Sequence, residues 1–124
     1  MSIESKVYTQ LTTATALTAL VATNIFPEHL IQGETLPGIV YRRAPGGQRV
    51  MSLSGYTGLE NPKIEVSVYA TSIDQRRAIG EVIISVMEAA TAFTAILPDG
   101  PIDDYVDDIA TYRRTMEFSV WHQE

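Results

Sequence analysis

The sequence predicts an α+β fold in which a mostly antiparallel sheet of about four to six strands carries two long helices packed on one face. Two segments, residues 3–21 and 72–92, have apolar residues at steps of three and four, as amphipathic helices do. Shorter segments alternate apolar and polar residues, as half-buried strands do. The expected order is helix, three strands, helix and two further strands (α-β-β-β-α-β-β), which is typical of an antiparallel sheet with one face in water.

The first helix is expected over residues 3–21, and Ser2 is a suitable residue to cap its start. Five threonines within it each lower the helix propensity by roughly a few tenths of a kcal/mol, so packing has to supply much of its stability. Asn24 and Pro27 end the helix, and residues 25–37 have the glycine, proline and charge content of a connecting loop.

Three strands are expected to follow the first helix. Residues 38–43 are rich in β-branched and aromatic side chains, and the Pro-Gly-Gly at residues 45–47 predicts a tight reversal. A strand over residues 49–54 would then pair back as a hairpin. Residues 55–62 contain two glycines and a proline and are expected to form a longer, mobile connection to the third strand.

The clearest strand pattern is at residues 63–69, and residues 113–121 repeat it near the end of the chain. Between the second helix and the last strand, residues 93–97 are a short extended piece, residues 98–101 a turn, and residues 102–108 a returning segment. The inner face of the sheet is expected to consist of the alternating apolar residues Ile64, Val66, Val68, Met116, Phe118 and Val120.

The second helix is expected to begin at Ser72, which stands three residues before Gln75 as in a capping box, and to run to about residue 92. Gly80 lies in its middle, where glycine costs about 1 kcal/mol relative to alanine. A glycine at this position predicts that the helix closely approaches the sheet.

Length and composition limit what the chain does. Its 124 residues suit one domain, residues 1–124, and 45% hydrophobic with 19% charged residues is a globular composition. The net charge of -6 and the pI of about 4.8 repel phosphates, so sequence-specific binding of nucleic acid is not expected. No stretch reaches the roughly 18 apolar residues of a bilayer span, so we expect no membrane partner and synthesis in the cytoplasm.

No pattern in the sequence predicts catalysis, a cofactor or a metal. There are no cysteines, and His29 and His122 lack a second ligand at helical spacing, so both are expected to be exposed or locally bonded. The acidic segment 103–108 has no internal glycine around which a calcium loop could wrap. Gly46 and Gly47 lack the Lys-Ser or Lys-Thr of a phosphate loop, and no G-x-S-x-G turn occurs. The chain is therefore not expected to be an enzyme.

Charged clusters and aromatic residues are instead candidates for contacts with other proteins. Arginines suit such contacts because a guanidinium group binds a carboxylate at two points. Trp121 falls on the wet side of the last strand by alternation, where packing under a loop and anchoring of another subunit are both open. The candidate interface residues are a basic set, Arg42, Arg43 and Arg49, an acidic set, Asp103, Asp104, Asp107 and Asp108, and the residues Tyr56, Leu59 and Trp121.

The order of elements resembles that of one known family along nearly the whole chain, and four segments carry the resemblance. They are LTALVATNIFP (residues 17–27), LPGIVYRR (36–43), NPKIEVSVYATSIDQ (61–75) and FSVWHQE (118–124). The family is that of small phage tail-completion and head-to-tail joining proteins, related in architecture to the tail terminators of long-tailed phages and prophages. None of the four segments is a catalytic signature, so the resemblance rests on order, length and pattern.

The resemblance implies a structural virion protein that caps the head-proximal end of a phage tail tube and joins the tail to the head. Such subunits typically form a hexameric ring between the tail tube protein and a head-completion or connector protein, with no cofactor. In a closed ring one face of each subunit meets a different face of the next, and the basic and acidic sets are candidates for these faces. An acidic channel would let DNA pass without sticking. The expected location is the tail end or neck of the virion.

Two other functions are left open. A head-closure or neck adaptor on the portal side would have the same size and composition. A small ligand-binding or enzymatic α+β domain would need converging polar groups in a pocket, and the almost purely apolar inner faces argue against it. The segment 55–62, with Tyr56 and Leu59 among its glycines, is either a loop that orders on contact with a partner or an ordinary hairpin loop.

Overall fold

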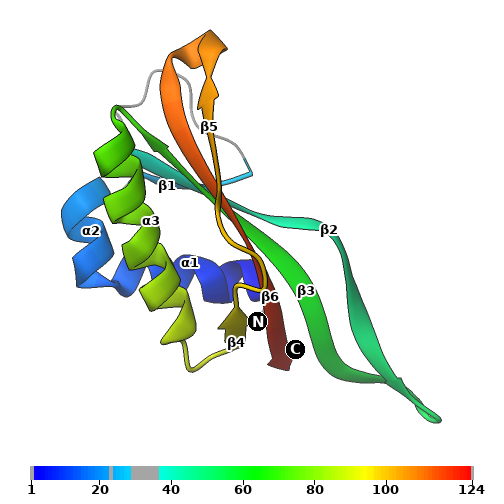
Figure 1. The fold of residues 1–124 in the computed structure, drawn as a ribbon. Helices are drawn as coiled ribbons and strands as arrows, with labels where there is room; N and C mark the ends of the chain where they lie inside the picture. The colour runs from blue at the N-terminus through cyan, green and yellow to red at the C-terminus, as the bar shows by residue number, and fades with distance from the viewer. Residues whose placement is uncertain (1, 23, 29–36, 124) are drawn as a thin grey trace.

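The structure is a computed structural model that describes residues 2–22, 24–28 and 37–123. Helices lie beside a long, twisted sheet (Figure 1). In chain order the elements are α1 (Ile3–Thr13), α2 (Thr15–Val21), β1 (Ile25–Pro27), β2 (Gly38–Ser52), β3 (Gly55–Ala70), α3 (Ile73–Glu88), β4 (Thr94–Ile96), β5 (Ile102–Val106), the 3-10 helix η1 (Asp107–Ile109) and β6 (Thr111–Gln123).

The strands form a sheet with the order β1-β2-β3-β6-β4, and β5 also pairs with β6. β1 runs parallel to β2, and every other pair is antiparallel. The predicted α+β class with a mostly antiparallel sheet is therefore confirmed. The predicted loop over residues 25–37 is wrong at its start, because Ile25 faces Ile39 and begins β1. Residues 29–36 of that segment lie outside the described residues.

The core lies between the helices and one face of the sheet (Figure 1). Ile64 and Val66 of β3 stand opposite Phe118 and Met116 of β6. All six residues predicted for the inner face are at most 1% exposed, which confirms that prediction. Burying each such side chain stabilises the fold by roughly 1.5–3 kcal/mol. The helices contribute Ile3, Val7, Leu11, Leu17, Val21, Ile79, Ile83 and Met87.

The first predicted helix is in fact two helices, because the chain leaves helical geometry at Ala14, where φ is -78° and ψ is 106°. The hydroxyl of Thr12 donates to the carbonyl of Tyr8 at 2.7 Å, and that of Thr13 donates to the carbonyl of Thr9 at 2.7 Å. Such bonds from a side chain back to the preceding turn compete with regular helix geometry and bend helices. The threonines therefore do more than lower the propensity: they mark the place where the helix breaks.

The second predicted helix is α3, and its start is confirmed. Ser72 Oγ accepts a hydrogen bond from the backbone N–H of Gln75 at 3.1 Å. In return, the Gln75 side chain accepts a hydrogen bond from the backbone N–H of Thr71 at 2.9 Å. The helix ends at Glu88, earlier than predicted. The close approach at Gly80 is also confirmed, since a Cβ there would stand 2.6 Å from Cδ of Arg114 on β6.

β2 and β3 form one long hairpin, and here the prediction is wrong. The chain does not reverse at residues 45–47: β2 continues through them to Ser52, and the turn is at residues 53–54. The two strands predicted on either side of the reversal are thus a single strand. The predicted mobile connection over residues 55–62 is also wrong, because these residues form the first half of β3.

The glycines that suggested a reversal serve a bulge instead. Between Ala44 and Gln48, β2 advances four positions while β3 advances two. Gly47 has a φ of +83°, which glycine adopts readily and which bulges often require. Between Arg49 and Met51 the extra residues are on β3, which advances four positions while β2 advances two. The two offsets cancel, so the residue pairs at the tip of the hairpin have the same register as those before the first bulge.

We expect Gly47 to resist substitution more than Gly55. Both have positive φ, but a Cβ at Gly47 would lie 2.5 Å from the carbonyl oxygen of Asn61, whereas one at Gly55 would meet nothing within 4 Å. G47A and G55A both incur the backbone cost of about 1–2 kcal/mol, and only G47A adds a steric cost of about 1–3 kcal/mol. The free energy of unfolding in urea should fall further for G47A by that steric cost. Equal losses would contradict the tight packing of the bulge.

Candidate assembly interface

The β2–β3 hairpin extends beyond the rest of the sheet as an arm. The pairing of β3 with β6 stops at Leu59 and Gln123, so among the described residues 49–58 form strand pairs only within the hairpin. Figure 1 shows the hairpin reaching well past the helices and the other strands. Met51 and Leu53, at its tip, are exposed, Leu53 completely. Residues 49–58 are called the arm below.

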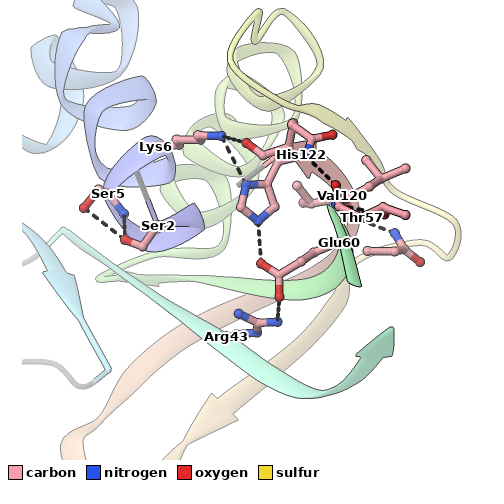
Figure 2. Close-up of polar contacts among 11 residues, drawn as sticks. Ser2, Ser5, Lys6, Arg43, Thr57, Glu60, Val120 and His122 are labelled. Carbon is pink, nitrogen blue, oxygen red and sulfur yellow. Dashed lines mark hydrogen bonds and ion pairs between the residues drawn. The ribbon is translucent and has the colours of Figure 1, made fainter. Parts of the chain in front are cut away.

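A buried carboxylate holds the root of the arm. Glu60 of β3 is 7% exposed, and it contacts Nε2 of His122 at 2.9 Å and accepts a hydrogen bond from the Arg43 guanidinium at 3.1 Å (Figure 2). Burying a charge without such partners would cost several kcal/mol, because the charge loses its contacts with water. Lys6, Arg43, Glu60 and His122 are called the root cluster below.

Lys6 completes the root cluster from α1. Its ammonium lies 3.1 Å from Nδ1 of His122 and donates to the backbone carbonyl of Gln123 at 2.8 Å (Figure 2). An ammonium group can only donate, so Nδ1 accepts, and the ring proton is on Nε2, which donates to Glu60. These contacts on both ring nitrogens fix the orientation of the imidazole, and the cluster joins α1, β2, β3 and β6.

The partners of Glu60 keep its carboxyl group ionised. Burial by itself raises the pKa of Glu60, but the hydrogen bonds from Arg43 and His122 outweigh burial and hold the pKa below its usual value. A carboxyl with a depressed pKa stabilises the folded state above its unfolded pKa, and this stabilisation is lost as the pH falls through the folded pKa. The root of the arm is therefore held at neutral pH and loosens in acid.

The sequence contains a signal for one member of this cluster. His122 continues the alternation of Met116, Phe118 and Val120, which places it on the inner face, and it is buried rather than exposed. Glu60 has no such signal, because the glycines in residues 55–62 predict a loop and not a strand. The contact between the two follows from the β3–β6 register, in which they stand opposite one another.

The predicted acidic set lies at the other edge of the sheet, and two of its members are paired within the subunit. Asp103 accepts bonds from Arg114 at 2.7 and 3.0 Å, and Asp104 accepts one from Arg113 Nε at 2.9 Å. Arg76 of α3 lies 3.7 Å from Asp103. The hydrogen bond from Arg114 to Asp103 and that from Arg113 to Asp104 lower the pKa of these carboxyls, against the effect of partial burial. Two aspartates and two arginines flanking a short turn are the sequence signal for this pairing.

The predicted basic set lies near the β2 edge. Arg42 donates to both carboxylate oxygens of Glu65, at 3.2 and 3.0 Å, Arg43 belongs to the root cluster, and Arg49 is exposed on the arm. Strand order thus places the basic and acidic sets toward opposite edges of one sheet. Two arginines and two aspartates of these sets are already paired with charges of their own subunit, and a role in contacts between subunits stays a prediction.

The other predicted contact residues are spread over the sheet. Leu59 is half-buried at the root of the arm, Asp107 is exposed at the start of η1, and Trp121 is 37% exposed on β6. The side chains of Tyr56 and Asp108 lie outside what the structure describes. A contact role for these residues also stays a prediction.

Exposed apolar side chains line the edge formed by β4, β5 and η1. They are Ile96, Ile102, Tyr105 and Ile109, which are between 48% and 69% exposed. We call these four residues the apolar edge. Apolar side chains that accumulate on one surface commonly mark a site of protein contact.

Two further properties bear on function. Within the described ranges, no three His, Asp or Glu side chains come together as a metal site would require, and His29 is not among the described residues. None of the helices in these ranges has the length and apolar character to cross a bilayer. The features that stand out are surfaces: the arm, its root cluster and the apolar edge.

Similarity to known proteins extends over nearly the whole chain, since residues 5–123 match the family described as Tail completion protein gp17. The chain belongs to this family. It is therefore a structural protein of phage tails, and the predicted family resemblance is confirmed. No curated protein matches the sequence.

One solved structure shows the same fold as this tail completion protein. It is a chain from a structure titled "Virion of native gene transfer agent (GTA) particle", with a TM-score of 0.70 and 15% sequence identity. The similarity covers 99% of this chain and 96% of that one, so it extends over the whole architecture.

We expect the carboxylate at the root of the arm to matter more for stability than a less buried counterpart on the same strand. Glu60 and Glu65 both lie on β3 and pair with an arginine of β2, but the Glu60 side chain is 9% exposed and that of Glu65 is 22% exposed. E60A, which leaves buried partners unpaired, should lower the free energy of unfolding by about 3–5 kcal/mol. E65A should lower it by about 0–1 kcal/mol. Small, similar losses in urea unfolding would contradict the role of the root cluster.

A second prediction concerns acid. Because the pKa of Asp103 is depressed, this carboxylate stabilises the fold above about pH 4 and less as the pH falls further. D103N should therefore lower stability at neutral pH and flatten the dependence of the unfolding free energy on pH between about pH 5 and pH 2. D107N is the control, since Asp107 is exposed in the same segment, and it should change this slope less. An unchanged slope in D103N would show that the ion pair with Arg114 does not form in solution.

Proposed function

We propose that this protein caps the head-proximal end of a phage tail tube and mediates the joining of tail and head as a hexameric ring. Residues 1–124 act as one tail-completion domain without enzyme activity or cofactor. The partners are other copies of the chain, the tail tube protein and a head-completion or connector protein. The site of action is the tail end or neck of the virion, after synthesis in the cytoplasm of the host.

The observation that carries this proposal, beyond family membership, is that two unlike surfaces with exposed apolar side chains lie on opposite sides of the subunit. The arm extends the β2–β3 side of the sheet, and the apolar edge lies on the β4–β5 side. A closed ring is built from one interface in which unlike surfaces meet, so each subunit needs such a pair. A subunit of the same fold occurs in the virion of a gene transfer agent, which supports a place in a particle.

The charge of the chain suits a ring through which DNA passes. The net charge of -6 repels phosphates, and this repulsion disfavours persistent binding of the passing DNA. No base-specific contact is needed for this role, and the partners that matter are proteins.

Deleting the gene from its phage tests the proposal. We expect complete heads and complete tails that do not join, because the tail end lacks its cap, and electron microscopy of the lysate measures the joined fraction. Purified protein added to the mutant tails should restore joining. Joined particles without the protein would contradict the proposal. Binding to purified heads instead of tails would identify the protein as a head-closure adaptor.

The same tails provide the copy number. A ring of six subunits of 13.7 kDa adds roughly 82 kDa to each tail end, and negative-stain images of the tail end should show sixfold symmetry around a central hole. Mass spectrometry of quantified tail preparations gives the number of copies independently. One or two copies per tail would exclude a ring.

A further inference from the structure

The tip of the arm differs from the rest of the surface in having no charge. From Val50 to Leu59 ten consecutive residues carry no side chain that is charged at neutral pH, and Arg49 and Glu60 flank this run. Met51 is 62% exposed within it, and Leu53 is fully exposed. Surfaces that remain in water usually carry charges, whereas the cores of protein contacts are depleted of them.

Near its root, the arm is supported by the Gln123 side chain, which donates to the carbonyl of Thr57 at 3.1 Å. Beyond Leu59 it is a two-stranded hairpin, and such a hairpin alone is marginally stable in water. The root cluster fixes where the arm begins, but among the described residues no helix or third strand covers its far half. A partner that packs against the tip would supply the missing burial.

The apolar edge provides a surface of matching chemistry. Ile96 and Ile102 are 53% and 69% exposed, and Ile109 is 49% exposed. Asp103 and Asp104, which stand next to Ile102 and Tyr105 in the sequence, are already paired with arginines of the same subunit. An apolar tip can therefore cover Ile102 and Tyr105 without leaving these two carboxylates buried and unpaired, which would otherwise cost several kcal/mol.

From these features we infer that the uncharged tip of the arm packs on the apolar edge of a neighbouring copy of this chain. The inference deepens the proposed function and rests on it, since it names the contact that closes the ring. A second copy is the partner because the two surfaces occur together on every subunit and on opposite sides of its sheet. Repeating this one contact around a ring leaves neither an arm nor an apolar edge uncovered.

Cross-linking on assembled tails tests the contact directly. The chain has no cysteine, so L53C can be mixed with I96C, I102C or I109C, each in a separate chain, and linked by a flexible bis-maleimide. Covalent dimers in such mixtures join two copies by construction. We expect dimers in at least one mixture at a yield about tenfold above that of L53C mixed with L20C, a control on the exposed face of α2. If none of the three mixtures exceeds this control, the inference is wrong.

A substitution at the tip gives an independent measurement. L53D places a charge in the proposed dry contact and should reduce the number of copies retained on tails about tenfold or more. S54D adds the same charge at the adjacent position of the turn and should reduce retention much less. Leu53 contributes nothing to the core, so the circular dichroism and unfolding midpoint of L53D should match those of the parent protein.

The outcomes separate this inference from the proposed function. If deletion of the gene blocks joining but L53D is retained on tails in as many copies as the parent protein, the proposed function holds and the inferred contact is wrong. If L53D forms rings that no longer bind tails, the arm contacts the tail tube, which also overturns the inference. If deletion of the gene leaves the joining of heads and tails intact, the proposed function is wrong, and with it the inference that rests on it.

Discussion

The alignment of β3 with β6 is the constraint on which the other features depend. It places Ile64 opposite Phe118, and through them sets the inner face that the helices cover. Followed toward the arm, the same alignment brings Glu60 opposite His122 and so creates the root cluster. Followed the other way, it leaves the second edge of β6 to β4 and β5, with the arginine pair of β6 facing two aspartates. One long-range pairing thus determines the core and both contact surfaces.

The distribution of charge changes the way assembly is expected to work. The arginines and aspartates that suggest contact between subunits are largely satisfied within the subunit, as Arg42 is by Glu65. Exchanging an exposed internal ion pair for one across an interface gains little, because each is worth about 0–1 kcal/mol. Apolar surface removed from water contributes about 25 cal/mol per Å². In the proposed ring, apolar contact would thus be the larger source of affinity, and the remaining charges would select the orientation of the partners.

The sequence predicts this fold well where the signal is local. The strands at residues 63–69 and 113–121 and the helix start at Ser72 follow from alternation and capping, which involve near neighbours. The reversal predicted at residues 45–47 is wrong because a glycine with positive φ serves a bulge as well as a turn. The root cluster could not be predicted as a unit, since the partner of Glu60 depends on strand register, which no local pattern specifies. The candidate contact residues were identifiable as charged, but their internal pairing needed the fold.

The two bulges of the hairpin restrict how its length can vary. The excess on β2 between Ala44 and Gln48 is balanced by an equal excess on β3 between Glu60 and Tyr56. A deletion of two residues in one strand alone would remove one bulge and leave the other without its balance. Every residue pair between that point and the turn would then change its partner. Matched deletions or insertions would change the reach and keep the pairing at the tip. Homologues that span a different distance are therefore expected to differ by compensating indels in both strands.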